Sequence, residues 1–190
     1  MPPSTAEIVL GLTLPGAPFE SVLIRHAEST WNVDGRWQGH GDPPLSARGR
    51  EQAEALARDL AGLRLELVVT SDLARAVETA APIARALGVG ATRCPGLREL
   101  DVGSWTGLTR AEIAARDREA LARFESGADG APAGGGETRS ELARRAREAL
   151  ADLSKRSTGS RIAVVTHLGV IRALVGCELG NAEWTRVRSS

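Results

Sequence analysis

Residues 23–32 read Leu-Ile-Arg-His-Ala-Glu-Ser-Thr-Trp-Asn, an apolar run that stops at an arginine and a histidine. The apolar residues from Val22 to Ile24 predict a short buried strand, so Arg25 and His26 follow at its C-terminal end. Open α/β sheets bind their ligands at that edge. A lone histidine after a strand is more often a surface or core residue than a catalyst, so this pair needs support from elsewhere in the chain.

The same layout recurs near the other end of the chain. Residues 161–166, Arg-Ile-Ala-Val-Val-Thr, predict a second strand that ends at His167, with a helix after it. Residues 66–70 predict a third strand, and Arg75 follows on the first turn of the next helix. Because the C-terminal ends of parallel strands meet at one edge of a sheet, we expect these side chains to lie together.

Strand and helix patterns alternate along the whole chain. A further short strand is predicted over 91–94, and helices are predicted to begin at Ser46, at Ser71-Asp72, at Thr109, at Thr138 and at Gly169. The helix from Thr109 is expected to run to about Arg123, and Thr109 with Glu112 forms a capping box. This alternation predicts an α/β fold, a three-layer sandwich with a mainly parallel sheet flanked by helices.

The length of 190 residues predicts one domain. Residues 1–20 hold four prolines and one apolar patch, and they are interpreted as an N-terminal extension or an extra edge strand, which leaves 21–190 as the domain. The polar connection over 27–45 is long enough to be functional. The glycine-rich residues 126–136 suit a mobile flap.

The composition argues for a small ligand. Basic and acidic residues number 24 each, and no long basic run is present, so nucleic acid and an anionic membrane are poor candidates for partners. No apolar run approaches the length of a membrane span and the N-terminus lacks a basic signal-peptide region, so we expect a cytoplasmic protein. Cys94 and Cys177 lie far apart, which fits reduced thiols. A homodimer is left open.

Two histidines and two arginines at one sheet edge suit a phosphoryl group. Such a group carries close to two negative charges at neutral pH, and the N–H groups of the helix after His167 add to its binding. We assign the nucleophilic role to His26, because imidazole attacks phosphorus and forms a labile phosphohistidine. Arg25 and Arg75 are expected to depress its pKa and keep it neutral.

Glu99 is the candidate acid. A protonated carboxyl can give its proton to the departing alkoxide and then accept one from the incoming water, so one residue serves both half-reactions. Because a carboxyl with an ordinary pKa of about 4.3 is mostly ionised at pH 7, we expect the fastest turnover in acid unless burial near Trp105 raises that pKa.

These residues stand in a series of motifs that resembles the histidine phosphatase (phosphoglycerate mutase-like) superfamily. Residues 25–32 resemble its Arg-His-Gly signature, and the resemblance covers roughly residues 21–178. The other motifs, in chain order, are Gln38-Gly39, Pro44-Leu45-Ser46 with Gly49 and Gln52-Ala53, Ser71-Asp72-Leu73-Ala74-Arg75-Ala76 with Thr79-Ala80, Leu97-Arg98-Glu99 with Gly103 and Trp105, Gly135-Gly136-Glu137, and Thr166-His167.

The resemblance implies a phosphoglycerate mutase-like fold and a metal-independent histidine acid phosphatase that needs no cofactor and acts on a small phosphorylated metabolite. By resemblance, His26 is the phosphorylated residue, Glu99 the proton donor, and the phosphate pocket is completed by Arg25, Arg75 and His167. Asn32 would also contact the phosphate, and Gln38 and Gly39 would line the substrate side.

Three departures from the family pattern are visible. Ala27 replaces the usual glycine, which is a mild change. Leu168 stands where a glycine normally follows the second histidine; its N–H can still bind phosphate, but its side chain narrows the pocket. The strand that usually follows the last helix has no clear counterpart, so we expect a truncated or rebuilt C-terminus, with the N-terminal segment as a candidate for that edge.

Two alternatives to a phosphatase stay open. A mutase would use the same pocket, but the 68 positions from Glu99 to His167 and the short tail favour water as the acceptor. A phosphate-binding module without catalysis is the other. The natural substrate is not determined; its specificity is expected in residues 104–136, where Phe124 offers apolar surface and Arg110 charge.

Overall fold

A mixed sheet forms the centre of the computed structural model, which describes residues 7–10, 20–127, 135–157 and 159–189. Its strands lie in the order β1-β6-β2-β5-β3-β4. Their bounds are β1 (Glu7–Leu10), β2 (Glu20–Arg25), β3 (Leu67–Thr70), β4 (Ala91–Arg93), β5 (Arg161–Thr166) and β6 (Trp184–Ser189). Strands β2, β5, β3 and β4 run parallel, whereas β6 is antiparallel to β2 and parallel to β1. The predicted α/β fold with a mainly parallel sheet is confirmed.

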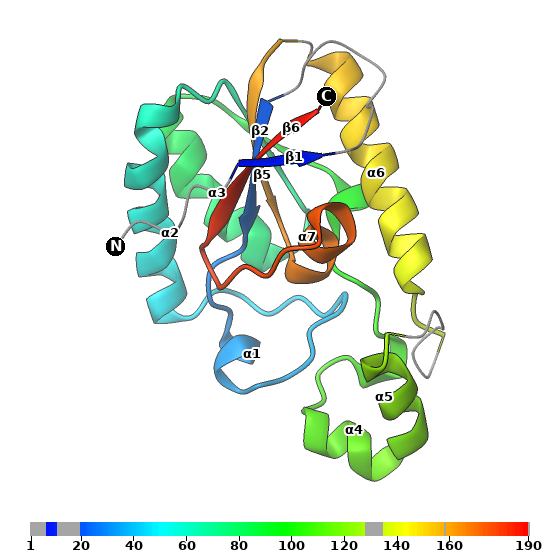
Figure 1. Cartoon of the computed structure of the whole chain (residues 1–190). Coiled ribbons are helices and arrows are strands. Elements are labelled where there is room, and N and C mark those ends of the chain that lie inside the picture. The colour runs from blue at the N-terminus through cyan, green and yellow to red at the C-terminus, as the bar shows by residue number, and fades with distance from the viewer. Residues whose placement is uncertain (1–6, 11–19, 128–134, 158, 190) are drawn as a thin grey trace.

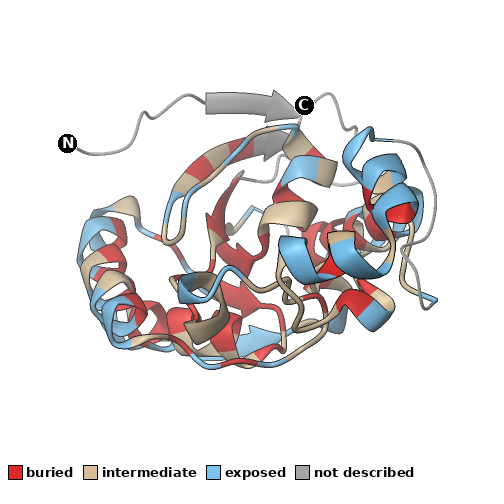
Figure 2. Ribbon diagram, turned by 90° about the horizontal axis from the view of Figure 1, so that it is seen from below, coloured by how far each residue is buried: buried red, intermediate tan, exposed pale blue. Residues whose placement is uncertain are grey.

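Helices cover both faces of this sheet, as Figure 1 shows. On one side lie α2 (Ala47–Leu60) and α3 (Ala74–Leu87), and on the other lie α6 (Arg139–Arg156) and α7 (Leu168–Val175). Strands β2 and β5, most of β3 and the inward faces of the helices are buried, whereas β4 at the sheet edge and the outer helix faces are exposed (Figure 2). Alternate strand residues divide between two apolar clusters, with Leu23 in one and Ile24 in the other, so each face of the sheet has its own core.

The remaining helical segments lie outside the two helix layers or connect their elements. They are α1 (Thr30–Val33), α4 (Arg110–Arg116) and α5 (Arg118–Glu125), with single 3₁₀ turns at Ala61–Leu63, Pro95–Leu97 and Gly103–Trp105. Helices α4 and α5 project together from the end of the molecule where the parallel strands stop (Figure 1). Among the described residues, no helix combines the length and the apolarity that crossing a bilayer requires.

Two predicted helix boundaries were wrong. The single helix expected from Thr109 to about Arg123 is interrupted at Asp117, whose extended backbone ends α4 and whose side chain accepts a hydrogen bond from Ala120 N to begin α5. Asp disfavours a helix interior because its carboxylate competes for nearby backbone groups in this way. Helix α3 has Leu73 as its N-cap instead of Ser71-Asp72, and the carboxylate of Asp42, from the long 27–45 connection, accepts from Ala74 N at 2.5 Å.

The C-terminal strand is also a correction. The sequence showed no clear strand after the last helix, yet Trp184–Ser189 forms β6 and pairs with β2 from Ile24↔Trp184 to Glu20↔Arg188. Its signal is weak because it is short and arginines follow both of its buried residues, Arg186 after Thr185 and Arg188 after Val187. Strand β1 lies outside β6 at the edge of the sheet. The domain boundary at residue 20 stays a prediction, and the expected flap falls largely on residues 128–134, outside the described part of the chain.

Glycine 49 lets α2 lie directly against the residues that follow β2. A Cβ added there would overlap the carbonyl oxygen of Glu28. That carbonyl accepts from Ser46 N at 2.9 Å, while Glu28 N donates to Gln52 Oε1 at 2.9 Å. Helix α2 and its N-cap therefore hold the backbone of Glu28, two residues after His26. Ser46 and Gln52 bind this backbone and Gly49 leaves room for it, which accounts for the three motif residues.

We expect Gly49→Ala to lower the free energy of unfolding by about 1–2 kcal/mol, because the overpacking cost of about 1–3 kcal/mol exceeds the gain of up to about 1 kcal/mol from alanine's helix propensity. The matched control is Gly62→Ala, where no atom lies within 4 Å of an added Cβ, and it should change stability by less than about 0.5 kcal/mol. Urea denaturation of both variants tests this. Equal stabilities would show that the close approach of α2 to Glu28 is not required.

Candidate active site

Two neighbouring strands bring the two predicted histidines together. Strands β2 and β5 pair in parallel with Arg25 opposite Thr166, and His26 N donates to Thr166 O at 2.9 Å. His26 and His167 are the residues that follow these two strands, and both are buried. Their ring centroids lie 5.1 Å apart with the rings tilted by 57°. The predicted convergence at the C-terminal edge of the sheet therefore holds for this pair.

His26 is held as a neutral imidazole with a defined tautomer. Its Nδ1 lies 2.7 Å from the carbonyl oxygen of Ala27. A carbonyl oxygen only accepts hydrogen bonds, so Nδ1 carries the proton and Nε2 keeps the lone pair. Burial, followed by the charge of Arg75 and then that of Arg25, holds the pKa of His26 well below its ordinary value of 6.5. The side chain is thus uncharged at neutral pH, with a free lone pair on Nε2.

Arg75 is a fully buried cation on the first turn of α3. Its guanidinium donates to Gly41 O at 2.7 Å and to Gly39 O at 3.0 Å, so two carbonyls of the long connection partly replace its lost hydration. Burial lowers its pKa to about 10, against the opposing effect of Glu99 and Asp42. It remains charged at neutral pH.

Unused donors gather around the histidines. Arg25 donates one N–H to Leu179 O at 2.7 Å, and burial lowers its pKa. Within the described part of the chain, Arg25 Nε, Arg75 Nε and both ring nitrogens of His167 are buried without a hydrogen-bond partner. Burial, followed by the charge of Arg75, also holds the pKa of His167 well below 6.5. Buried polar groups normally have partners, so this group of nitrogens fits an anion with several oxygens.

Glu99 reaches the same site from a different segment. Its two carboxylate oxygens accept from Leu100 N at 2.9 Å and from Gly169 N at 3.3 Å. A Cβ added at Gly169 would overlap the Glu99 carboxylate, so a larger residue here would displace that carboxylate from its present position. The charge of Glu99 is also the leading influence that opposes the fall in the pKa of Arg25 and Arg75.

A cavity of about 540 Å³ joins these groups. Four of the five predicted catalytic residues line it, Arg25, His26, Arg75 and Glu99, together with the predicted substrate-side residues Gln38, Gly39 and Leu168. His167 is fully buried and absent from the lining, with its ring next to that of His26. Asn32 is absent from the lining. Its Oδ1 accepts from Ser29 N in the capping box at the start of α1, and from Asn181 Nδ2 at 3.3 Å.

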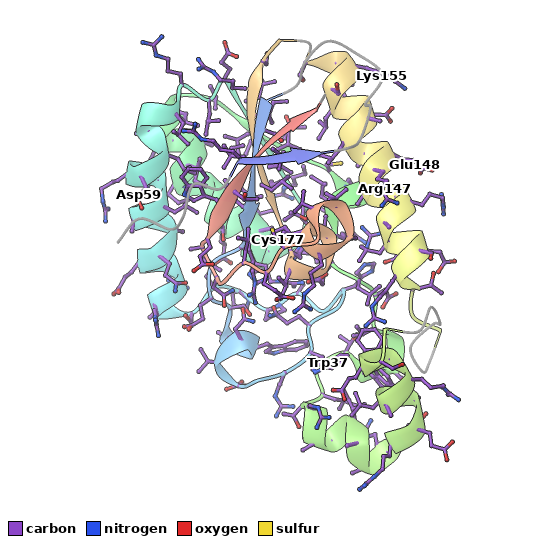
Figure 3. The ribbon with its side chains drawn as sticks, in the orientation of Figure 1. Trp37, Asp59, Arg147, Glu148, Lys155 and Cys177 are labelled. Carbon is purple, nitrogen blue, oxygen red and sulfur yellow. The ribbon has the colours of Figure 1, made fainter. Side chains whose placement is uncertain are left out.

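The outer wall of the cavity is aromatic and basic. Trp37 packs against Phe124 at 5.3 Å and edge-on against Trp105 at 5.6 Å between ring centroids, and it lies between the loop around α1 and the α4–α5 pair (Figure 3). The guanidinium of Arg139 stacks over Phe124 at 4.1 Å. Arg110, a candidate from the sequence, pairs instead with Glu125 on the surface.

Two lining arginines were missed by the sequence analysis. Arg139, at the start of α6, has no periodic pattern that points to the site. Arg172 lies four residues after Leu168 on α7, and this helical spacing was a usable signal.

A second cavity of about 560 Å³ shares lining residues with the first, among them Phe124, Arg139 and Arg172. The described residues contain no group of three or more His, Cys, Asp or Glu side chains placed to hold a metal ion.

Comparison with known proteins agrees with this geometry. Residues 21–189 match the model of the histidine phosphatase superfamily (branch 1). The chain is 34% identical to phosphoserine phosphatase 1 of Hydrogenobacter thermophilus, over 84% of this chain and 75% of the relative. It is 42% identical to a metal-independent phosphoserine phosphatase of Arabidopsis thaliana, over 82% of this chain and 66% of the relative. A mycobacterial glucosyl-3-phosphoglycerate phosphatase solved with VO3 superposes with a TM-score of 0.79 at 34% identity, covering 88% of this chain and 90% of that one.

The two buried neutral histidines make stability depend on pH. In the unfolded chain their pKa values return to about 6.5, so below this pH the unfolded state binds protons that the folded state does not. We expect the free energy of unfolding to fall as the pH drops from about 6.5, by up to about 1.4 kcal/mol per pH unit for each histidine. Urea denaturation between pH 5.5 and 7.5 measures the slope. His167→Asn should have a shallower slope, and identical slopes would contradict a depressed pKa at His167.

Proposed function

The chain belongs to the histidine phosphatase superfamily, and we propose that it hydrolyses small phosphomonoesters with His26 as the residue that is phosphorylated. The observation that carries this assignment is the hydrogen bond from His26 Nδ1 to Ala27 O in a buried, arginine-lined cavity. It leaves Nε2 with a lone pair beside the cations that a phosphoryl group requires.

In the first step, His26 Nε2 attacks phosphorus, an N–P bond forms and the ester P–O bond breaks. Arg25, Arg75 and His167 hold the phosphoryl oxygens, since their unused buried N–H groups gather around the attacking nitrogen. Leu168 N–H, at the start of α7, is a further donor for these oxygens.

Glu99 gives its proton to the departing alkoxide. Water then attacks the phosphohistidine and returns a proton to Glu99, the N–P bond breaks, and inorganic phosphate leaves with His26 neutral again. The hydrogen bonds from Leu100 N and Gly169 N fix the direction of the carboxyl. Gln38 and Gly39 line the side of the cavity where the alcohol portion would lie.

The substrate class we propose is a phosphate ester whose organic part also carries a carboxylate. The named relatives act on phosphoserine and on glucosyl-3-phosphoglycerate, both of which fit this description. Arg139 supports it, because its guanidinium lies over Phe124 in the cavity wall and adds a cation beyond the phosphate arginines, whereas Arg172 is paired with Glu178. Trp37 and Phe124 supply an apolar face against which the carbon skeleton can pack.

Release of phosphate from p-nitrophenyl phosphate and from phosphoserine should continue in EDTA and fall by more than about 10³-fold in His26→Ala, because the N–P bond cannot form without the imidazole. Acid quenching during turnover should trap an acid-labile phosphoryl group on His26 that mass spectrometry detects. Interconversion of 2- and 3-phosphoglycerate without phosphate release would instead assign a mutase. Phosphate binding without turnover would assign the non-catalytic module.

The role of Glu99 has its own test. In Glu99→Gln, kcat/KM for phosphoserine should fall by about 10²–10⁴-fold, because an alkoxide leaves poorly without a proton. For p-nitrophenyl phosphate, kcat/KM should change only a few-fold, since nitrophenolate leaves unassisted and this ratio reports the first step alone. An equal fall for both substrates would remove Glu99 from the role of proton donor.

A further inference from the structure

Glu99 lies on a stretch of backbone without regular secondary structure. Residues 98–102 connect the 3₁₀ turns Pro95–Leu97 and Gly103–Trp105. Such a stretch supplies none of the ladder bonds that fix strands and helices, so its carbonyl groups need partners from elsewhere. The position of a catalytic carboxyl at this place depends on those partners.

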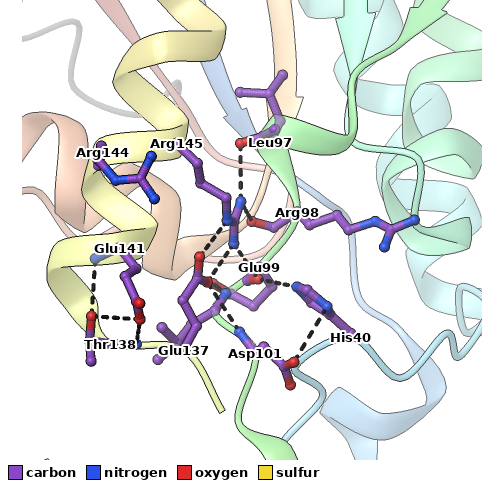
Figure 4. Close-up of polar contacts among 12 residues, drawn as sticks. His40, Leu97, Arg98, Glu99, Asp101, Glu137, Thr138, Glu141, Arg144 and Arg145 are labelled. Carbon is purple, nitrogen blue, oxygen red and sulfur yellow. Dashed lines mark hydrogen bonds and ion pairs between the residues drawn. The ribbon is translucent and has the colours of Figure 1, made fainter. Parts of the chain in front are cut away.

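One side chain binds the first two carbonyls of this stretch and one carbonyl in the 3₁₀ turn before it. Arg145, on α6, donates to Gly96 O at 3.0 Å, to Arg98 O at 2.7 Å and to Glu99 O at 2.8 Å (Figure 4). These bonds join residues 46 to 49 positions apart in the sequence. Through the carbonyls of Arg98 and Glu99, Arg145 thus holds the peptide groups on both sides of the Glu99 Cα.

Glu137 fixes the guanidinium of Arg145. Its two carboxylate oxygens accept from Arg145 Nε at 2.6 Å and from NH2 at 2.8 Å. With the three carbonyl bonds, all five N–H donors of Arg145 are used. The two side chains are only 20% and 15% exposed, so this ion pair is screened far less than a surface pair.

The Glu137 backbone is itself joined to the same stretch. Glu137 N donates to Asp101 O at 2.8 Å, and a Cβ added at Gly136 would overlap that same oxygen. The motif Gly135-Gly136-Glu137 has no part in the phosphate pocket. Its glycine permits the close approach, and its carboxylate orients the arginine.

A second contact ties Glu99 to the 27–45 connection. His40 Nε2 lies 2.9 Å from Glu99 O, in the connection whose Gly39 and Gly41 carbonyls hold Arg75. Since the carbonyl accepts, Nε2 is the donor. The carbonyl of Glu99 therefore receives one bond from α6 and one from the loop.

We propose that Arg145, oriented by Glu137, is a positioning residue that holds Glu99 in place for proton transfer. The inference rests on the proposed function, because it takes Glu99 as the proton donor. Arg145 makes no hydrogen bond to Arg25, His26, Arg75 or His167 in the described structure, and its charge lowers the pKa of His167 only after burial, Arg75 and His26. Loss of Arg145 should therefore impair protonation of the leaving group and leave phosphate binding intact.

The decisive variant is Arg145→Gln, compared with wild type on two substrates. For phosphoserine, kcat/KM should fall by about 10–100-fold, since a misplacement of about 1 Å at a catalytic group costs up to about 10²-fold. For p-nitrophenyl phosphate, kcat/KM should change by less than about 3-fold, because this leaving group needs no proton. Competitive inhibition by inorganic phosphate should keep its constant, since the phosphate pocket is unchanged.

Arg144→Gln is the matched control. Arg144 is the neighbouring residue on α6, its side chain is 66% exposed, and it pairs only with Glu148 one turn on among the described contacts. It should match wild type on both substrates. Glu137→Gln should repeat the selective loss of Arg145→Gln, and the double variant should lose no more than the larger single effect, because the two residues act as one unit.

Equal losses on both substrates, or no loss on phosphoserine, would overturn the proposal and assign Arg145 a role in folding alone. If Arg145→Gln fails to fold by circular dichroism, Glu137→Gln and Arg145→Lys carry the same two-substrate comparison. Failure of the proposed function is distinguishable, because wild type would then lack EDTA-resistant turnover or would retain it in His26→Ala.

Discussion

The site depends on the parallel pairing of β2 with β5. Because Arg25 lies opposite Thr166 and His26 N donates to Thr166 O, the two strands end at the same level and deliver His26 and His167 side by side. A slip of one residue would turn one of the two side chains to the opposite face of the sheet. The adjacency of two imidazoles is thus a consequence of register, and the register is held by the apolar residues that fill both cores.

The second constraint is the burial of the positive charge of Arg75, which is stabilised by the long connection over 27–45. A guanidinium without water needs acceptors, and the carbonyls of Gly39 and Gly41 supply them to Arg75. Asp42 in the same connection caps α3, whose first turn carries that arginine. The connection therefore binds both the guanidinium of Arg75 and the helix start that carries it. Within the described structure, Arg75 Nε has no hydrogen-bond partner. Burial then lowers the pKa of both histidines, so the site holds fixed cations beside neutral imidazoles.

Glu99, the candidate acid, is held in position in a different way. His26, His167 and Arg75 follow strands or begin helices, whereas Glu99 stands on irregular backbone and takes its position from tertiary hydrogen bonds. The start of α7 and the 27–45 connection also bind Glu99, through Gly169 N and His40, so they link it to the histidines and arginines.

The sequence by itself determined the α/β architecture, the strands that carry Arg25, His26 and His167, and the helix that carries Arg75, because these follow from local apolar periodicity and from where each strand stops. It missed β6, because the arginines of this strand hide its apolar pattern and its structure depends on pairing with β2. It also merged α4 with α5, because Asp117 acts as an N-cap only when the backbone turns at that residue. Asn32 was placed on the phosphate by resemblance, although in the structure its side chain caps α1 and is absent from the cavity lining. Only the tertiary structure decided that Arg139 and Arg172 line the cavity and that Arg145 and Glu137 hold Glu99, since contacts between residues tens of positions apart leave no local pattern in the chain.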